Sequence, residues 1–323
     1  MNNLTEKVKV TVVIPTYNRA DFIANAVQSI LQQGHNDVEI IIVDDGSTDN
    51  TARVVGVLQK QHSNILYCSN KRTKGPSGAR NTGIIQASGE YLAFLDSDDV
   101  WLAGHLTNGL EIFTKYPEID ILFGNFNVVD FQAGKHLYDF FGQKKILHAL
   151  KSVQISPGFK MLQDNLFEAL IQENFFHLAS AIIRKASAHN ILLDESIMFS
   201  EDRDFGIRLY KEENATFAYR EDPVFVMHRH DANLNRDGDL HKSEQLIDAH
   251  LYLWRKYLTS YHLSHHEKKI LAKLFANRLL KLSAIHRKQG HRQKALVSTI
   301  KSFKYGLSLN HFEQLARVLV PFV

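Results

Sequence analysis

The sequence has one cysteine, Cys68, among its 323 residues, and it has no apolar run of the roughly 18 residues that a membrane-spanning helix needs. A lone cysteine forms no disulfide within the chain, so we expect a reducing compartment. The first ten residues, MNNLTEKVKV, lack the apolar stretch and the cleavage site of a signal peptide. With 44% hydrophobic and 23% charged residues, the composition excludes a collagen, a coiled coil and a disordered chain. We therefore expect a globular protein of one large domain, or of one domain and a smaller appendage.

Four motifs that mark common enzyme classes are also absent. Because G-x-x-x-x-G-K followed by Ser or Thr is missing, we do not expect a P-loop nucleotidase, and the lack of G-x-G-x-x-G after the first predicted strand argues against a dinucleotide oxidoreductase. Neither the G-x-S-x-G elbow nor the H-E-x-x-H helix occurs.

The net charge of +3 is the sum of two regions of opposite sign. Residues 251–323 contain 14 Lys and Arg and 2 Asp and Glu, whereas residues 1–250 contain 24 basic and 33 acidic residues. The acidic part includes clusters of carboxylates, and the basic part favours an anionic partner, if it has one.

The first part of the chain alternates short β-branched runs with longer helical patterns such as Ala20–Gln33. The predicted strands are Val8–Ile14, Val38–Val43, Asn64–Cys68, Tyr91–Leu95 and Ile119–Phe123. Near-continuous apolar strands separated by helices predict an α/β fold, with a mostly parallel sheet flanked by helices. Residues 131–175 show few regular signals, and we expect loops or short helices there that shape a cleft.

After about residue 240 the strand pattern disappears, and helical periodicity replaces it. The predicted helices are Leu240–Ser260, Glu267–Arg287, Arg292–Tyr305 and Asn310–Val320. We therefore predict two domains, an α/β domain over residues 1–238 and a basic α-helical C-terminal region over residues 239–323.

Polar residues follow the predicted strands. Asp44–Asp49 follows the second strand and Asp96–Asp99 follows the fourth. Turns favour such residues, but carboxylates that lie close together repel unless a cation or hydrogen-bond donors neutralise them. Ligands of open α/β sheets bind at the carboxyl ends of the strands, and carboxylate oxygens suit Mg²⁺ or Mn²⁺ bridged to phosphates. The pattern predicts a metal-dependent site for a phosphorylated ligand.

Five motifs in register resemble those of family 2 glycosyltransferases over about residues 8–235. They are Val12–Arg19, Val43–Asp49, Gly78–Asn81, Phe94–Asp99 and Ser200–Phe205, and Arg229–His230 is similar to a later basic segment of that family. The resemblance implies a GT-A fold, a nucleotide-sugar donor that is most often UDP-linked, a divalent metal (Mn²⁺ or Mg²⁺) and inversion at the anomeric carbon. It implies an enzyme that transfers a hexosyl or N-acetylhexosaminyl group.

The resemblance also implies roles for individual residues. The residues expected to bind the nucleotide sugar are Pro15, Thr16, Tyr17, Asn18, Asp45, Asn70, Arg80 and Asp96. Tyr17 would stack on the base, Asp45 would accept the uracil N3–H, and Asn70 and Arg80 would contact the uracil or the diphosphate. Asp96 would face the ribose or a metal-bound water.

Asp98 and His230 are the expected metal ligands. The alternative for His230 is a contact with the diphosphate. The family often has an aromatic residue and an arginine where Met227 and His228 stand here. The sequence does not decide whether Asp99 is a metal ligand or only an acid beside the following helix.

Asp202 is the expected catalytic base, because direct displacement requires the acceptor hydroxyl to lose its proton as it attacks. Glu201 is expected to orient the acceptor or to support Asp202. The alternative is that both acids only stabilise the first turn of a helix.

We expect a saccharide or lipid-linked saccharide acceptor in surface polysaccharide biosynthesis. The location is expected to be cytoplasmic, with peripheral contact to the cytoplasmic face of the membrane as an option. For residues 240–323, packing on the catalytic domain and contact with an anionic membrane surface are the leading interpretations, and no nucleic acid is expected. Two alternative functions are a non-catalytic nucleotide-sugar-binding module and a sugar nucleotidyltransferase.

Overall fold

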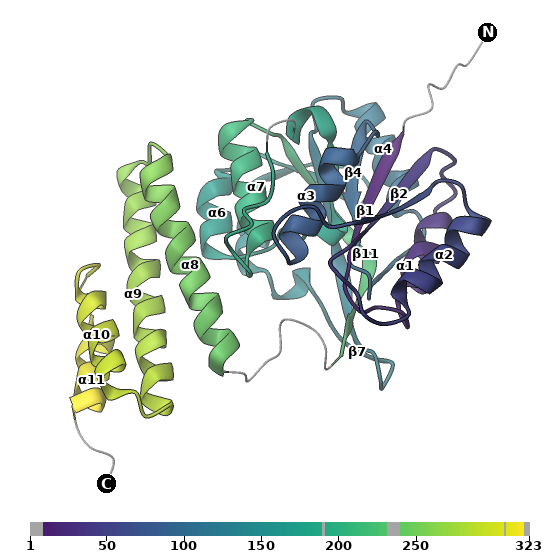
Figure 1. Cartoon of the computed structure of the whole chain (residues 1–323). Coiled ribbons are helices and arrows are strands. Elements are labelled where there is room, and N and C mark those ends of the chain that lie inside the picture. Colours follow the sequence, from purple (N-terminus) through teal and green to yellow (C-terminus); the bar gives the residue numbers. More distant parts are fainter. Residues whose placement is uncertain (1–8, 189–190, 231–239, 307, 320–323) are drawn as a thin grey trace. The chain divides into compact units, whose positions relative to one another are not determined.

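The structure, a computed structural model, describes residues 9–188, 191–230, 240–306 and 308–319 (Figure 1). Its contacts divide the chain into two compact units, Met1–His230 and Asp231–Val323. The predicted boundary between residues 238 and 239 lies outside the described residues, as do Val8 of the first predicted strand and residues 320–323.

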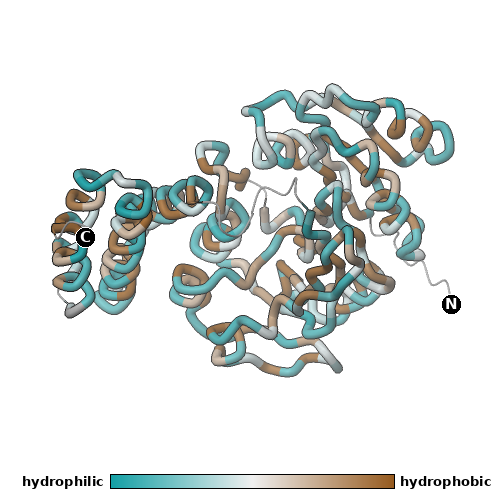
Figure 2. Tube along the Cα trace, turned by 90° about the horizontal axis from the view of Figure 1, so that it is seen from below, coloured by the Kyte–Doolittle hydropathy of each residue, from teal (hydrophilic) through white to brown (hydrophobic). Residues whose placement is uncertain are grey.

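The first half of the first unit repeats the strand–helix pattern predicted from the sequence. Its elements are β1 (Val10–Thr16), α1 (Ile23–Leu31), β2 (Val38–Asp44), α2 (Thr51–Gln61), β3 (Ile65–Ser69), α3 (Pro76–Gln86) and β4 (Tyr91–Phe94). The four strands pair in parallel in the order β3-β2-β1-β4. All seven residues of β1 are buried, as expected of a parallel strand covered on both faces. In Figure 2 hydrophobic stretches, in brown, run through the interior of this unit.

The second half of this unit extends the sheet in mixed orientation. It contributes β5 (Val100–Trp101), α4 (His105–Lys115), β6 (Ile121–Asp130), β10 (Ile182–Arg184), α7 (Glu201–Glu212) and β11 (Phe217–Arg229). Strand β10 is antiparallel to both β4 and β6, and β11 is parallel to β6. The α/β fold class is confirmed, but the described sheet as a whole is mixed rather than mostly parallel, because the short strands added beyond β4 pair mainly antiparallel.

Residues 131–175 are more regular than their sequence suggested. They contain β7 (Lys135–Asp139), a 3₁₀ turn (Phe141–Gln143), α5 (Lys145–Ala149), β8 (Ser152–Ser156), β9 (Phe159–Leu162) and α6 (Leu166–Gln172). Two short 3₁₀ turns follow, η2 (Leu178–Ser180) and η3 (Lys185–Ala188). Strands β7 and β8 are largely solvent-accessible, so they have no continuous apolar run by which to recognise them.

The connections in the parallel part create a crevice. Strand β1 pairs with β2 on one side and with β4 on the other. The chain runs from β1 outward to β2 and β3, and then returns through α3 to β4 on the other side of β1. Right-handed crossovers then place α3 on the face opposite to α1 and α2, as Figure 1 shows. Such a switch point opens a ligand crevice at the carboxyl ends of the strands.

The second unit consists, in its described residues, of α8 (Leu240–Ser260), α9 (His265–Lys288), α10 (Arg292–Phe303) and α11 (Leu309–Leu319). These are the predicted helices, with ends that differ by a few residues. Helix α9 begins with a capping box in which Ser264 and Glu267 bond to each other's backbone N–H. The core of the second unit includes Trp254 and Tyr257 of α8 and Phe275 of α9.

Among the described helices, none has the length and apolar character required to cross a bilayer.

Candidate active site

The first polar group lies at the carboxyl end of β1. Pro15 and Thr16 are the last residues of the strand, and the buried Oγ1 of Thr16 has no hydrogen-bond partner among the described residues. Tyr17 follows with 43% of its surface exposed, and Nζ of Lys74 lies 4.8 Å from the centroid of its ring. The aromatic face and a cation are therefore together at the mouth of the crevice.

Asn18 shapes the turn that follows. Its φ of 51° is in the left-handed region, which asparagine tolerates better than most residues. Its Oδ1 accepts the N–H of Thr48 at 2.8 Å, and its own N–H donates to Oγ of Ser47 at 2.9 Å. Asn18 thereby ties the end of β1 to the turn after β2, so it positions the crevice wall.

Asp45 and Asn70 meet although they follow different strands. Oδ1 of Asp45 accepts from Nδ2 of Asn70 at 2.7 Å, and Oδ2 accepts the N–H of Gly75 at 2.8 Å. Gly75 has a φ of 125°, which L side chains rarely adopt, so a side chain there would be strained. The carboxylate thus holds residues 70–75 beside Tyr17.

A second cluster forms around Asp98. Its Oδ2 lies 3.3 Å from Nε of Arg19 and accepts from Nε2 of His230 at 3.0 Å. Asp98 and His230, predicted as ligands of one metal, are therefore in contact although they are far apart in sequence. In the sequence Arg19 is the last residue of the Val12–Arg19 motif, and nothing in that motif predicted that its side chain would reach Asp98.

Asp99 follows Asp98 in the chain and is bonded to β11. It is buried, and its Oδ1 accepts the backbone N–H of His228 at 2.9 Å. Burial, followed by the charges of Asp98 and Asp96, raises the pKa of Asp99 well above its ordinary value. This geometry favours a role in holding β11 against the turn after β4.

A third cluster surrounds Arg80, which projects from α3 and is only 4% exposed. Its Nη2 donates to Oδ1 of Asp96 at 2.7 Å, and its Nη1 donates to Oε1 of Glu201 at 3.1 Å. Nη1 also lies 3.9 Å from Oδ1 of Asp202. One buried guanidinium therefore contacts three carboxylates from two parts of the chain.

The charged groups in this cluster shift one another's pKa values. Burial alone would lower the pKa of Arg80, but the negative charges of Asp96, Asp202 and Glu201 raise it above its ordinary value, so the guanidinium stays charged. Burial alone would raise the pKa of Asp96, and the charge of Arg80 instead brings it below its ordinary value. Burial and the Asp202 charge raise the pKa of Glu201 to about 7, against the lowering effect of Arg80.

His177 completes the surroundings of Asp202. Its Nδ1 accepts the N–H of Ala179 at 3.3 Å and lies 3.7 Å from Oδ2 of Asp202. The same Oδ2 accepts the N–H of Leu178 at 3.1 Å. The sequence offered no motif for His177, because a single histidine among 17 carries no pattern.

Glu195 is a further residue that the sequence did not single out. It accepts from Nδ2 of Asn81 at 2.7 Å, pairs with Arg72 and lies near the N–H of Thr73 at 3.3 Å. Burial opposes these contacts, but the hydrogen bonds from Asn81 and Arg72 lower the pKa of Glu195 to about 2. Glu195 links the loop before α7 to the loop held by Asp45.

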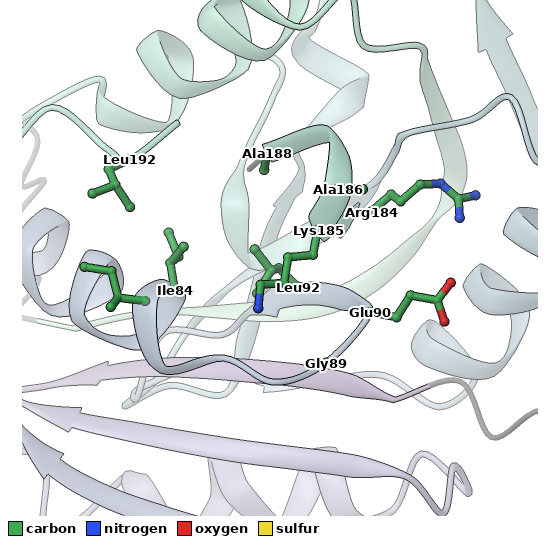
Figure 3. Close-up of a pocket in the computed structure, with 10 residues that line it drawn as sticks. Ile84, Gly89, Glu90, Leu92, Arg184, Lys185, Ala186, Ala188 and Leu192 are labelled. Atoms are coloured by element: carbon green, nitrogen blue, oxygen red, sulfur yellow. The ribbon is translucent and has the colours of Figure 1, made fainter. Parts of the chain in front are cut away.

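A separate hollow of about 870 Å³ lies at the opposite end of β4 (Figure 3). Arg184 and Glu90 lie on one side of it and Ile84 and Leu192 on the other. None of the predicted site residues lines it. The carboxylate clusters, rather than this hollow, therefore mark the candidate site.

Asp98 and His230 are side chains of the kinds that bind divalent cations in proteins. Among the described residues, no group of three or more His, Cys, Asp or Glu side chains is arranged to hold a metal ion. Mg²⁺ sites commonly use one or two carboxylates, with substrate phosphates and water as the other ligands. Asp98 supplies one carboxylate and His230 one imidazole, with Oδ2 of Asp98 at 3.0 Å from Nε2 of His230.

Known proteins resemble this chain in both sequence and structure. A UDP-Glc:alpha-D-GlcNAc-diphosphoundecaprenol beta-1,3-glucosyltransferase of Escherichia coli is 36% identical over 121 residues, which are 38% of this chain and 47% of that protein. A GalNAc(5)-diNAcBac-PP-undecaprenol beta-1,3-glucosyltransferase of Campylobacter jejuni is 46% identical over 100 residues, 31% of this chain and 32% of that protein. The chain thus spans less than half the length of these curated relatives.

A solved mannosyltransferase from Pyrobaculum calidifontis, in complex with GDP-Man and Mn²⁺, has the same fold. The TM-score is 0.58 at 18% identity, and the match covers 97% of this chain and 80% of that one. The expected GT-A architecture is confirmed.

The family described as "Glycosyl transferase family 2" matches residues 11–183, more than half of the 323 residues. This span contains β1 to β4, Arg80 and the Asp96–Asp99 turn. The chain therefore belongs to glycosyl transferase family 2.

Proposed function

We propose that the protein transfers a hexosyl or N-acetylhexosaminyl group from a UDP-linked donor, with inversion, to a hydroxyl of a lipid-linked saccharide in surface polysaccharide biosynthesis. The observation that carries this proposal is the Arg80 cluster. There a single guanidinium contacts Asp96, at the carboxyl end of the donor-binding strands, and the Glu201–Asp202 pair at the start of α7.

The donor would lie along the carboxyl ends of β1, β2 and β3. The exposed ring of Tyr17 offers a stacking face, and the carboxylate of Asp45 offers an acceptor for the edge of a base. Asn70 would act by holding that carboxylate, because its Nδ2 donates to Asp45 and to the carbonyl oxygen of Thr73. Uracil has an N–H donor at N3 that suits the carboxylate of Asp45. The E. coli relative, whose name includes UDP-Glc, supports this choice of nucleotide.

The diphosphate would lie beside the cluster of Arg19, Asp98 and His230, and we propose Asp98 and His230 as ligands of Mn²⁺ or Mg²⁺. A bound divalent cation would stabilise the negative charge of the departing diphosphate. Arg19 supplies a fixed positive charge at 3.3 Å from Asp98. Asp96, held by Arg80, faces the ribose in this arrangement.

Asp202 would act as the base in a single displacement. As the acceptor oxygen forms its bond to the anomeric carbon, its proton passes to the carboxylate of Asp202, and the bond from that carbon to the diphosphate oxygen breaks with its electron pair leaving on UDP. The backbone N–H of Leu178 holds Oδ2, and the buried Oδ1 has no hydrogen-bond partner among the described residues, so Oδ1 is the oxygen left for the acceptor hydroxyl. Glu201 would orient the acceptor or keep Asp202 in place.

A lipid-linked acceptor is supported by the two relatives, whose names specify undecaprenol-linked substrates. We propose the cytoplasmic face of the membrane as the place where such an acceptor is met. Acceptor and sugar selectivity would come from residues 125–200, which contribute η2 and the loop before α7.

The decisive experiment measures nucleotide release from a panel of UDP-, GDP- and dTDP-sugars with Mn²⁺ or Mg²⁺, with and without EDTA, in the presence of an undecaprenyl-diphosphate-linked saccharide. We expect release of UDP that needs both the metal and the acceptor, and NMR of the product should show the inverted anomer. Binding of a nucleotide sugar without turnover would instead identify a non-catalytic binding module. Release of pyrophosphate from a nucleoside triphosphate and a sugar phosphate would identify a nucleotidyltransferase.

A further inference from the structure

Helix α11 buries two polar side chains and leaves two large apolar side chains exposed. His311, Gln314 and Val318 are buried, whereas Phe312 and Leu319 are 55% and 61% exposed. The outer side also carries a half-buried Leu315 and an exposed Ala316, which completes the spacing i, i+3, i+4, i+7 of an apolar helix face. In a globular protein that face normally packs against the core, so its exposure here calls for a partner.

Specific contacts hold the helix in this orientation. Nδ1 of His311 lies 2.7 Å from Oγ of Ser308, and Nε2 of Gln314 donates to the carbonyl oxygen of Leu280 at 3.4 Å. The rings of Phe303 and His311 pack with centroids 5.3 Å apart. His311 and Gln314 therefore face the second unit together with the buried Val318, and Phe312, whose ring packs on Phe303 at a centroid distance of 5.8 Å, keeps more than half of its surface exposed.

Helix α10 likewise buries small and polar side chains and exposes apolar ones. It buries Ala295, Ser298, Thr299 and Ser302, with Oγ1 of Thr299 2.7 Å from Oγ of Ser283 on α9. Small side chains allow α10 to approach α9 closely. Its outer side presents Val297 and Ile300, 48% and 57% exposed. Helices α10 and α11 lie side by side (Figure 1), and apolar and polar stretches alternate along both in Figure 2.

Lysines frame the apolar residues of α10. Lys294, Lys301 and Lys304 are exposed and share the helix side of Val297 and Ile300. No acidic residue occurs in α10, and the one acid of α11, Glu313, lies 3.6 Å from Arg317. Residues 251–323 as a whole carry 14 basic and 2 acidic residues.

This charge pattern distinguishes between two possible partners of the exposed face. A second copy of the chain that docked through the same face would bring its own lysines against these lysines, and like charges repel. A bilayer with anionic headgroups matches both features, because it attracts the lysines and accepts apolar side chains at the boundary of its acyl chains.

We propose that the outer faces of α10 and α11 dock on the surface of an anionic lipid bilayer. The apolar residues Val297, Ile300, Phe312, Leu315 and Leu319 enter the headgroup boundary, and the lysine ammonium groups contact lipid phosphates. The inference extends the proposed lipid-linked acceptor by naming the surface that would bring the enzyme to it, and it is tested by binding rather than by turnover.

The test is co-sedimentation of the full chain with vesicles of phosphatidylcholine alone or of phosphatidylcholine with 30% phosphatidylglycerol. We expect binding only to the anionic vesicles, with a loss of at least tenfold in affinity when the salt is raised from 0.1 to 0.5 M. Phe312→Ser combined with Leu319→Ser, and separately Lys301→Glu combined with Lys304→Glu, should each weaken binding tenfold or more. The control pair Val57→Ser with Lys60→Glu, on exposed positions of α2, should bind as the unchanged protein does.

Circular dichroism and light scattering of the same samples make the result decisive. If the α11 pair keeps its helicity and still binds anionic vesicles fully, or if the unchanged protein binds neither vesicle, the proposal is wrong. If the unchanged protein is a dimer that the α11 pair makes monomeric, the face is a self-association surface instead. UDP release measured on the same preparations with a detergent-solubilised acceptor reports separately on the proposed transfer, so vesicle binding without UDP release would overturn only the proposed function.

Discussion

The guanidinium of Arg80 donates from Nη2 to Oδ1 of Asp96 across 2.7 Å, and this bond joins α3 to the turn after β4. Because the other terminal nitrogen donates to Glu201, the same side chain fixes the start of α7. The proposed donor side and the proposed catalytic base thus share one buried cation. Changes at this residue should affect both folding and transfer.

Arg80→Met should be one of the most damaging single changes in the chain. It leaves Asp96, Glu201 and Asp202 close together without a positive charge, and removal of one partner of a buried ion pair typically costs ~3–5 kcal/mol. We expect a loss of that size in the free energy of unfolding, measured by urea titration. Arg80→Lys keeps the charge but not the two-sided contact, so it should recover part of the stability and little of the transfer. Equal stability of both variants and the unchanged protein would show that the cluster is not structurally important.

Asp202→Asn should abolish proton transfer while it preserves the shape of the site. Loss of a general base commonly slows catalysis by about 10²–10⁴-fold. We expect that decrease in kcat for UDP release with acceptor, and unchanged affinity for the UDP-sugar by calorimetry. Asp222→Asn, at a side chain that is 70% exposed, serves as the matched control. Near-normal turnover of the Asp202 variant would rule out its role as the base.

Asp98→Ala and His230→Ala should each weaken metal-dependent binding of the donor. In the structure the two side chains are in direct contact, so both would lie beside the same cation. We expect the Mn²⁺ concentration needed for half-maximal UDP binding to rise by about tenfold or more. Direct binding of Mn²⁺, followed by electron paramagnetic resonance, gives a readout apart from activity. Unaltered Mn²⁺ binding by the Asp98 variant would exclude it as a ligand.

Glu201 should make stability depend on pH between about 4.5 and 7. Its pKa is raised from 4.5 to about 7 in the folded protein, so the folded state binds more protons than the unfolded state in this window. The contribution of Glu201 to stability is then fully present below pH 4.5 and is lost as the pH rises through about 7. Urea unfolding at pH 5, 6, 7 and 8 checks this, with Glu201→Gln as the comparison.

The Gln variant lacks this titration, so the unchanged protein should lose stability relative to it as the pH rises. A difference between the two proteins that stays constant from pH 5 to 8 would contradict the raised pKa. Glu212→Gln, at the other end of α7, provides the control for the loss of one carboxylate from the same helix.

The sequence alone predicted the strands and the helices whose signal is local. Strands β1, β2 and β4 are buried on both faces and read as apolar runs, and the helices of the second unit follow a 3.6-residue period. Strands β7 and β8 were missed because their residues are largely accessible to solvent and therefore carry no such run.

The residues of the candidate site were also predictable only in part. Motif order placed Asp45, Asp96 and Asp98 at strand ends, where an open sheet binds ligands. That Arg80 would reach Asp96 and Glu201, or that Arg19 and His230 would meet at Asp98, depends on contacts between residues up to 132 positions apart. His177 and Glu195 had no motif at all, and only packing brought them to the site.

The opposite charges of the two parts of the chain were evident from the sequence by itself, since charge is a property of composition. The direction in which α10 and α11 turn their apolar sides was decided by the tertiary structure. A helical period shows that a helix has two faces, but it does not show which face is buried. Here Ser298, Thr299, His311 and Gln314 find partners or close packing inside the second unit, and this leaves the apolar faces outward.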